Sequence, residues 1–334
     1  MLSRQLRRVP QSTDVVKAGG RSWLGAGRQL RWRDAEHGVA GRWVGDWPVG
    51  VDEFGLYAGF AVGDIAQRSR WIEPGTFLMG SPGNETDRSD DETQHVVRLS
   101  RGYWLADTAC TQAMWQAVMG DNPSNFKDDP RNPVEQVSWK DVVQEFVPRL
   151  NRLVPGLEAG LPSEAQWEYA CRAGTQTAFS FGETITPEQV NYNGNYPYKG
   201  GRKGLNRQHT VPVGSLPANE WGLYEMHGNV WEWCSDWYGD YDGGSAVDPE
   251  GPEEGGVRVL RGGSWFSFAG RCRSAFRNLF EPGFRYHAGP GDRSVGIGFR
   301  LAPGRASMVG TTRPAEPAAR ARSPGRGTRP GPEE

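Results

Sequence analysis

The sequence predicts an α+β domain that is rich in loops and contains short strands and few helices. Glycine and proline account for 46 and 24 of the 334 residues. Both are more frequent than in an average protein and favour turns over long regular elements. The chain also holds 14 tryptophans, whose large rings can pack against irregular backbone. After residue 174 the pattern predicts almost only loops and short strands.

The spacing of apolar residues predicts strands first and a long helix later. Residues 55–83 alternate apolar and polar side chains around Gly-Asp and Pro-Gly turns, which indicates successive short strands. A helix is predicted from Ser138, because Val142, Phe146 and Leu150 recur every four residues and form one apolar stripe.

Two further helices are predicted on either side of this one. Ser163 and Gln166 have the spacing of a capping box, and Gly174 follows the last turn as a stop signal, so a helix is predicted between them. A shorter helix is predicted over residues 111–119.

One folded domain is expected between two flanking segments. Residues 1–50 carry nine basic and four acidic side chains with little periodicity. This is typical of a basic, partly disordered leader, and a nucleic-acid-binding arm is the alternative. Residues 303–334 form a tail of Pro, Gly, Ala and Arg without aromatic residues, so they cannot bury enough apolar surface to fold. The domain is therefore assigned to residues 51–302.

Charge and cysteine content exclude several classes of protein. A net charge of −2 provides no field that would attract nucleic acid or a membrane surface. No run of 18 apolar residues predicts a membrane span. The four cysteines form no CxxC pair, which argues against a zinc knuckle or a thioredoxin motif. We expect a cytoplasmic monomer without nucleic-acid or membrane partners.

Six short motifs occur in order along residues 71–302. They are GTFLMGSP (75–82), PVEQVSWKDV (133–142), LPSEAQWEYACRAG (161–174), PVGSLPANEWGLYEMHGNVWEW (212–233), RVLRGGSW (258–265) and GIGFRLA (296–302). Together they resemble the sulfatase-modifying-factor domain family, which includes the formylglycine-generating enzymes. The resemblance implies a C-type-lectin-like core with long loops. The family includes copper-dependent oxidases that convert a sulfatase cysteine to formylglycine, iron enzymes, and non-catalytic binding domains.

The resemblance implies that an oxidase of this family binds Cu⁺ through two cysteines five residues apart. Here the second position is Cys272 and the first is Ser267. Ser264 and Trp231 match positions that line the oxygen pocket in the family. A serine hydroxyl is harder and far less acidic than a thiol, so it cannot replace a thiolate as a Cu⁺ ligand. Whether the chain is an enzyme is left open, with an altered oxidase as the alternative function.

A calcium site is predicted in the segment EMHGNVWEW. Glu225, Gly228, Val230 and Glu232 stand at offsets of 0, 3, 5 and 7. Two carboxylates and two main-chain carbonyls on one tight loop suit Ca²⁺, which takes six or more oxygen ligands. The resemblance implies structural calcium at these four positions. The alternative is that Glu232 forms a salt bridge and the tryptophans form core.

Residues 265–295 have the layout of a binding surface, in which frame residues alternate with aromatic and small polar residues that suit an adaptable paratope. The second set comprises Phe266, Ser267, Phe268, Phe276, Leu279, Phe280, Phe284, Tyr286, His287, Asp292 and Ser294. The pattern resembles the variable proteins of diversity-generating retroelements, whose codons vary at adenines. Arg273, Arg277, Arg285 and Arg300 are expected to hold the loops through charge-assisted hydrogen bonds.

These observations predict a calcium-stabilised module that binds a protein or another surface ligand through residues 265–295 without catalysis. Burial of all five phenylalanines in this span is not expected, so an exposed apolar patch is predicted there.

Overall fold

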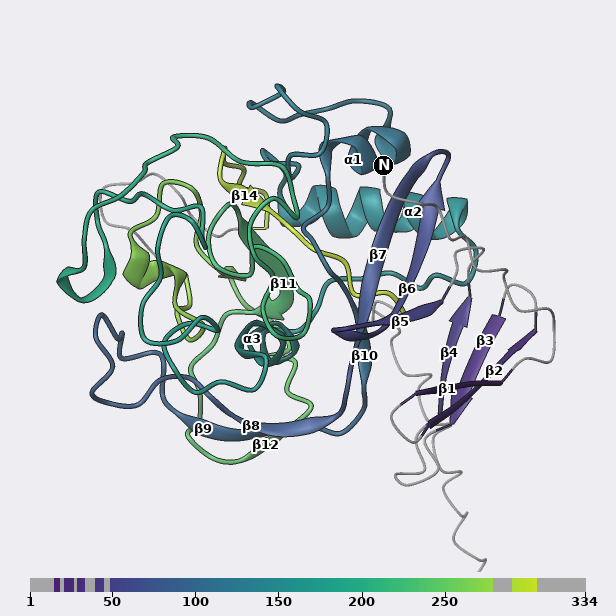
Figure 1. Cartoon of the computed structure of the whole chain (residues 1–334), viewed down its shortest axis with the longest axis horizontal. Coiled ribbons are helices and arrows are strands. Elements are labelled where there is room, and N and C mark those ends of the chain that lie inside the picture. The colour runs from purple at the N-terminus through teal and green to yellow at the C-terminus, as the bar shows by residue number, and fades with distance from the viewer. Residues whose placement is uncertain are drawn as a thin grey trace, which may run out of the picture.

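The computed structural model describes residues 49–278 and 290–304, and the backbone of four strands closer to the N-terminus. Those strands are β1 (Val15–Ala18), β2 (Arg21–Ala26), β3 (Gln29–Arg33) and β4 (Ala40–Val44). They pair antiparallel in chain order (Figure 1). The expectation of a partly disordered leader did not anticipate this sheet. The signal was present in β3, where Leu30 and Trp32 alternate with polar residues.

Two further sheets contain the strands predicted over residues 55–83. One has the order β10-β7-β6-β5 with antiparallel neighbours, and the other has the order β12-β9-β8. Their strands are β5 (Gly50–Asp52), β6 (Gly55–Val62), β7 (Ile65–Ile72), β8 (Gly75–Met79), β9 (His95–Leu99), β10 (Tyr103–Ala106) and β12 (Ala246–Val247). The breaks before β7 and β8 fall at the Gly-Asp and Pro-Gly turns, which confirms the strands predicted from them.

A third sheet lies in the C-terminal half of the domain and has the order β13-β11-β14. Its central strand is β11 (Trp231–Trp237), which pairs antiparallel with β13 (Arg258–Arg261) and parallel with β14 (Ile297–Gly298). Two 3₁₀ turns, η2 (Tyr198–Gly200) and η3 (Ala269–Cys272), interrupt the loops around it.

The two helices predicted before residue 154 are present. One is α1 (Gln112–Met119), and the other starts as the π-helical segment η1 (Asp141–Phe146) and continues as α2 (Val147–Leu153). Pro148 lies in the first turn of α2, and the wider π turn before it suits a residue that has no N–H to donate. Trp139 and Lys140, before η1, are also helical, and Ser138 caps this first turn because its hydroxyl accepts a hydrogen bond from Asp141 N at 3.1 Å.

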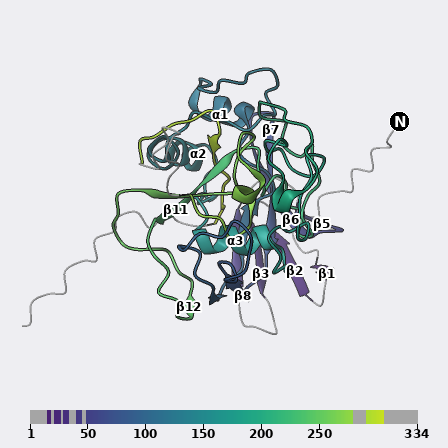
Figure 2. The ribbon, with the colours of Figure 1, turned by 90° about the vertical axis from the view of Figure 1, so that its left-hand side faces the viewer.

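The third helix, α3 (Glu164–Arg172), has the predicted capping box. Ser163 Oγ accepts from Gln166 N at 3.3 Å, and Gln166 Oε1 accepts from Ser163 N at 3.0 Å. The left-handed turn that ends the helix begins at Ala173, one residue before the predicted stop. In both views α3 lies between β11 and the β12-β9-β8 sheet (Figures 1 and 2).

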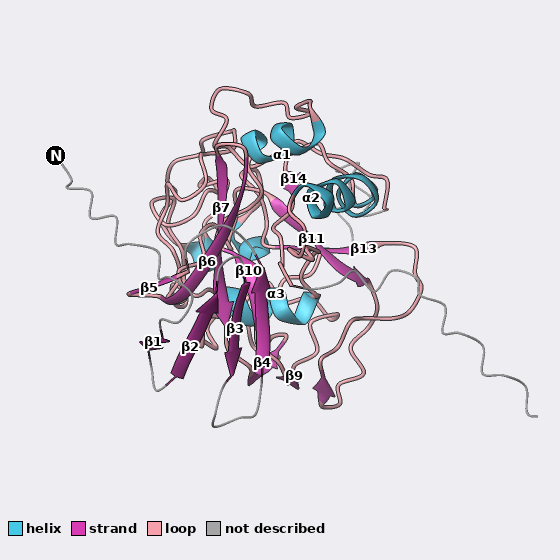
Figure 3. Ribbon diagram, turned by 90° about the vertical axis from the view of Figure 1, so that its right-hand side faces the viewer, coloured by secondary structure: helices cyan, strands magenta, loops and turns pink. Residues whose placement is uncertain are grey.

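The largest apolar core joins three parts of the chain through aromatic contacts: α1, the π-helical segment η1 and the residue that follows β14, Phe299. The Trp115 and Phe146 rings stack with centroids 5.0 Å apart, and Phe299 meets Phe146 edge-on at 5.2 Å. Loops make up much of the chain around this core (Figure 3). The architecture therefore confirms a loop-rich α+β fold with few helices.

The Ser163 cap can be tested by substitution. Ser163→Ala removes the acceptor for Gln166 N at a buried helix terminus, so we expect the free energy of unfolding to fall by about 1 kcal/mol. Urea unfolding followed by circular dichroism measures the change. Ser245→Ala, at an exposed position, serves as the control. Equal stability of the two variants would contradict the role of the cap.

Candidate functional site

The Gly-Gly-Ser-Trp turn after β13 places Cys272 beneath it. Gly262 and Gly263 have φ angles of 96° and 79°, which lie in the left-handed region that favours glycine. A Cβ on Gly263 would lie 2.5 Å from Cys272 Sγ. Only glycine therefore lets this backbone rest directly on the thiol.

Ser264 and Ser267 form a buried pair within the same turn. Their hydroxyl oxygens are 3.1 Å apart, and Ser267 Oγ also accepts from Ser264 N at 3.0 Å. The backbone closes the turn in the other direction, because Ser267 N donates to Ser264 O at 3.0 Å. Ser267 thus holds the turn with its hydroxyl and does not reach an exposed surface, which corrects its prediction as a surface ligand residue.

The Cys272 thiol is fully buried beside this pair. Its Sγ lies 3.8 Å from Phe268 O, and burial raises the pKa of the thiol. The thiolate is the form that attacks electrophiles and binds metals. The structure therefore presents Cys272 as a protonated side chain packed against glycine.

Trp231, the other predicted oxygen-pocket residue, reaches this region through Gly296. Its backbone N donates to Gly296 O at 2.7 Å, and a Cβ on Gly296 would lie 3.2 Å from Ser264 Cβ. The Trp231 ring packs on Phe276 with centroids 5.9 Å apart. Gly296 therefore links the Trp231 backbone to Ser264, whereas the Trp231 ring packs against Phe276.

A second buried thiol, which the sequence did not indicate, lies beside His227. Cys171 Sγ is 3.7 Å from His227 Nε2 and 3.7 Å from Ser274 Oγ. His227 Nδ1 is 2.7 Å from Cys272 O. Burial lowers the pKa of His227 to about 4 and raises the pKa of Cys171 to about 12. Both groups are therefore neutral at pH 7.

Arginine–glutamate pairs fasten the segment that follows the turn, as predicted for Arg273 and Arg277. Arg273 contacts both oxygens of Glu92 at 2.7 Å, and Arg277 contacts both oxygens of Glu164 at 2.7 and 2.8 Å. Although burial opposes ionisation, the paired guanidinium holds the pKa of Glu92 below its usual value. Bidentate geometry of this kind fixes orientation as well as charge. The predicted role of Arg285 lies outside the described residues.

Arg300, the last of the predicted arginines, binds the carboxylate that was expected to hold calcium. Its Nε and Nη2 atoms donate to Glu232 Oε2 and Oε1 at 2.6 and 2.7 Å, and Trp167 Nε1 donates to Oε2 at 2.7 Å. Both oxygens of Glu232 are thus engaged, so this side chain does not fit the role of a calcium ligand. The salt-bridge alternative describes its contacts.

Glu225 has different hydrogen-bond partners from Glu232, because its donors are backbone N–H groups. Its carboxylate accepts from Gly214 N at 3.0 Å and Leu216 N at 3.3 Å, and the side chain is buried. The backbone of Gly228 and Asn229 has φ angles of 80° and 65°, which bends this loop sharply. Of the two predicted acidic ligands, Glu225 is the one that Arg300 does not clamp, and each of its oxygens accepts a single backbone hydrogen bond. Among the described residues, no group of three or more His, Cys, Asp or Glu side chains forms a metal-binding cluster.

Among the predicted surface residues that the structure describes, Phe268 is exposed, and it pairs with Tyr196, which lies outside the predicted span. Phe268 and Tyr196 are 43% and 51% exposed, and their ring centroids are 4.1 Å apart. The Arg271 guanidinium lies 5.4 Å from the Phe268 ring. Backbone hydrogen bonds from Asn193 N to Ser267 O and from Ala269 N to Tyr196 O join the two loops. We call Tyr196, Phe268 and Arg271 the aromatic platform.

The other predicted surface residues are less exposed. Phe266 and Phe276 are half-buried, with Phe266 edge-on to Trp265 at 4.9 Å. Ser294 is buried, and Asp292 is half-buried. Of the five phenylalanines, only Phe268 is exposed among those that the structure describes. The predictions for Leu279, Phe280, Phe284, Tyr286 and His287 lie outside the described residues.

Glu135 is a buried carboxyl group that the sequence analysis did not single out, and Phe126 links it to Trp265. Glu135 Oε1 accepts from Asn125 N at 2.5 Å and Phe126 N at 2.9 Å, while Oε2 has no hydrogen-bond partner among the described residues. Burial raises the pKa of Glu135 to about 7, and the Lys127 charge opposes this rise. Phe126 in turn packs edge-on against Trp265, at 5.4 Å.

Two solved structures share this arrangement of elements. Variable protein 1 of Treponema denticola has a similar structure, with a TM-score of 0.62 and 27% identity over 74% of this chain and 99% of that one. PvdO from Pseudomonas aeruginosa gives a TM-score of 0.59 at 27% identity, over 74% of this chain and 97% of that one. The fold is the C-type-lectin-like fold of the formylglycine-generating enzymes.

Sequence similarity then defines the family. Residues 62–303 match the "Sulfatase-modifying factor enzyme 1-like domain", and the chain belongs to this family. The formylglycine-generating enzymes of Thermomonospora curvata and Streptomyces coelicolor are each 34% identical, over 60% and 62% of this chain. The aligned parts cover 63% and 66% of those relatives, so the chain spans less than two thirds of either.

No helix in the described part of the chain combines the length and the apolar character needed to cross a membrane.

Glu135 predicts a pH-dependent stability. Because burial raises its pKa from 4.5 to about 7, the folded state favours the protonated carboxyl, and this contribution to stability is lost as pH rises from about 4.5 to 7. Glu135→Gln keeps an acceptor for Asn125 and Phe126 without the charge. We expect it to raise the free energy of unfolding by about 2 kcal/mol at pH 8 and to have little effect at pH 4. Urea unfolding at both pH values measures this, and an equal effect at both would refute the assignment.

Proposed function

We propose that this chain is a binding module of its family, which holds a protein or peptide partner on the aromatic platform and does not oxidise cysteine. One observation carries the proposal: the position of one copper-binding cysteine is Ser267, whose hydroxyl is consumed in a buried pair with Ser264. Cys272 is then left as a single protonated thiol. Soft thiolate ligands select Cu⁺, and a hydroxyl does not substitute for one.

The platform has the features of a recognition surface. Two exposed rings in contact offer rigid apolar area, and the Arg271 guanidinium beside them adds a charged group. Aromatic residues and arginine are the types most enriched at the energetic centres of protein interfaces. The backbone bonds between the two loops keep the rings in place before a partner binds, which lowers the entropic cost of association.

An altered oxidase is the second candidate. It is favoured by the similarity to formylglycine-generating enzymes and by the presence of Cys272 under the Gly-Gly-Ser turn. Such an enzyme would have to act through Cys272 alone, since Ser267 supplies no thiolate.

The binding proposal predicts that Phe268 is an anchor. Peptides selected from a random phage-displayed library against the full chain should lose at least about tenfold in affinity with Phe268→Ala, because truncating an interface aromatic anchor costs more than about 1.4 kcal/mol. Biolayer interferometry measures this affinity.

Leu153→Ala provides the matched control, since Leu153 is an apolar side chain that is 54% exposed elsewhere on the domain. Selected peptides that bind both variants as well as the parent chain would contradict the platform as the binding site. A selection that enriches no peptide would do the same.

We also propose that calcium stabilises the domain through Glu225. The support is a buried carboxylate that accepts hydrogen bonds from two backbone N–H groups, on a sharply bent loop. Calcium should raise the thermal midpoint of the chelator-treated chain, because an ion that binds the folded state stabilises it by mass action. Glu225→Gln should remove this response. A midpoint that does not change with calcium in the parent chain would exclude the site.

A further inference from the structure

The loop that carries Tyr196 of the aromatic platform is rich in positive charge. Residues 189–219 contain four basic side chains, Lys199, Arg202, Lys203 and Arg207, and no aspartate or glutamate. The whole chain has a net charge of −2, so the excess of positive charge is local. A concentration of like charge on one part of a surface attracts ligands of the opposite sign. We call residues 194–207 the basic loop.

Backbone and side-chain hydrogen bonds hold the basic loop in place. Gly204 N donates to Gly194 O at 2.8 Å and closes the loop, with Tyr196 between the two glycines. The buried Tyr198 anchors it, because its hydroxyl donates to Thr86 O at 2.6 Å. One ring of the platform and the basic side chains are therefore carried by the same closed loop.

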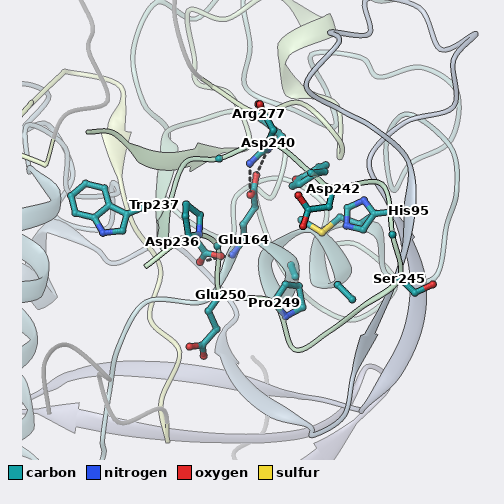
Figure 4. Close-up of a pocket in the computed structure, with 18 residues that line it drawn as sticks. His95, Glu164, Asp236, Trp237, Asp240, Asp242, Ser245, Pro249, Glu250 and Arg277 are labelled. Atoms are coloured by element: carbon teal, nitrogen blue, oxygen red, sulfur yellow. Dashed lines mark hydrogen bonds and ion pairs between the residues drawn. The ribbon is translucent and has the colours of Figure 1, made fainter. Parts of the chain in front are cut away.

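Most of the charge on the basic loop is not neutralised by the rest of the domain. Elsewhere, arginines are bound to carboxylates, and Figure 4 shows one such pair, Arg277 with Glu164, beside the cavity next to α3. In the basic loop, Lys199 is paired with Glu183 at 2.8 Å. The other three basic side chains form no ion pair with any residue that the structure describes.

The three unpaired side chains differ in burial. Arg202 and Lys203 are exposed, whereas Arg207 is half-buried. Burial lowers the pKa of Arg207, and the charge of Glu188 opposes this fall. The Nη1 atom of Arg207 has no hydrogen-bond partner among the described residues. A carboxylate that contacted this guanidinium would form a charge-assisted hydrogen bond and reduce the cost of its burial.

Exposed apolar surface lies beside this charge. The structure describes seven large apolar or aromatic side chains that are exposed, and three of them, Tyr196, Leu205 and Phe268, are in the platform or the basic loop. Leu205 directly follows the loop closure, and its carbonyl oxygen lies against Gly194. A simple anion would leave these apolar side chains in water. Their clustering suits a partner that offers apolar and acidic groups together.

The opposite charge nearest to the platform is on its η3 side. Asp87 is exposed, and its carboxylate lies against Gly270 of η3. The Arg271 guanidinium is on the same side, 5.4 Å from the Phe268 ring. Charges of both signs thus occur beside η3, whereas the basic loop carries positive charge alone. Acidic groups of a partner are therefore expected to lie over the basic loop.

We propose that the partner of the aromatic platform is an acidic peptide segment, with an apolar or aromatic side chain on Tyr196 and Phe268. Its carboxylates are received by the three unpaired residues of the basic loop, Arg202, Lys203 and Arg207. This inference rests on the binding function proposed above and names the chemical class of the partner.

Isothermal titration of the full chain with two end-blocked peptides tests the proposal. One is the acidic peptide Gly-Asp-Asp-Trp-Asp-Gly, and the other is its neutral isostere Gly-Asn-Asn-Trp-Asn-Gly. We expect the acidic peptide to bind at least tenfold more tightly than the neutral one, and raised salt to reduce this difference. No binding of the acidic peptide, or equal affinity for the two, would overturn the proposal.

A double variant locates the charge contacts. Arg202→Gln/Lys203→Gln should weaken binding of the acidic peptide about fivefold, as expected for two exposed charge pairs, and leave the neutral peptide unaffected. Arg98→Gln/Arg101→Gln is the control, since it removes the same charge from exposed positions in and after β9. An equal loss of affinity in both double variants would show a general effect of net charge and contradict the assignment.

Phe268→Ala separates this inference from the binding function on which it rests. If it weakens both peptides while the acidic one is not preferred, the platform binds peptides and only the acidic class of partner is wrong. If it changes the affinity for neither peptide, the platform is not the binding site and both proposals fail. A heparin octasaccharide that binds as tightly as the acidic peptide would indicate a general anion site and also overturn the inference.

Discussion

Arg261 joins three parts of the chain at one buried point. From the end of β13 it reaches Glu168 and Glu164 on α3, and it donates to the carbonyls of Ser274 and Ala275 at 2.8 and 3.1 Å. Both carboxylates are shared, Glu168 with Arg172 and Glu164 with Arg277. Removing one partner of a buried pair leaves an uncompensated charge, which typically costs 3–5 kcal/mol. The geometry of the Gly-Gly-Ser-Trp turn is therefore tied to α3.

This constraint separates the turn from the surface beside it. The turn, held from below by Arg261 and packed on Cys272, buries Ser264 and Ser267. Directly after Ser267 the chain emerges at Phe268, where η3 begins and the ring meets Tyr196. The positions that would carry oxidation chemistry, Ser264, Ser267 and Cys272, are thus buried. Phe268 of the aromatic platform, in contrast, is exposed and can contact a partner. A domain of this kind can change its surface residues with little effect on the fold.

The fold could be predicted from the sequence where local chemistry decides it. The capping box at Ser163 and the four-residue spacing through Val142 and Phe146 gave two helices, and the turn dipeptides gave β6 to β8. Paired arginines were predicted as a class, and Arg273, Arg277 and Arg300 confirm it.

The features that could not be predicted from the sequence depend on contacts between residues that are far apart along the chain. Glu232 was assigned to calcium because the loop motif is local, whereas its partner Arg300 lies 68 positions away. The Cys171–His227 contact and the buried state of Ser267 are likewise set by packing across the domain. Tyr196 was missed because nothing in its own segment shows that it stacks on Phe268.

The central claim is that a buried hydroxyl has taken the place of a copper-binding thiolate. Competitive titration of Cu⁺ against a chromogenic chelator, on the reduced chain and on Cys272→Ser, tests it most directly. The account predicts that the two proteins compete equally poorly with the chelator, because a single protonated and buried thiol is a weak ligand. One equivalent of tightly held Cu⁺ in the parent chain that disappears in Cys272→Ser would contradict it.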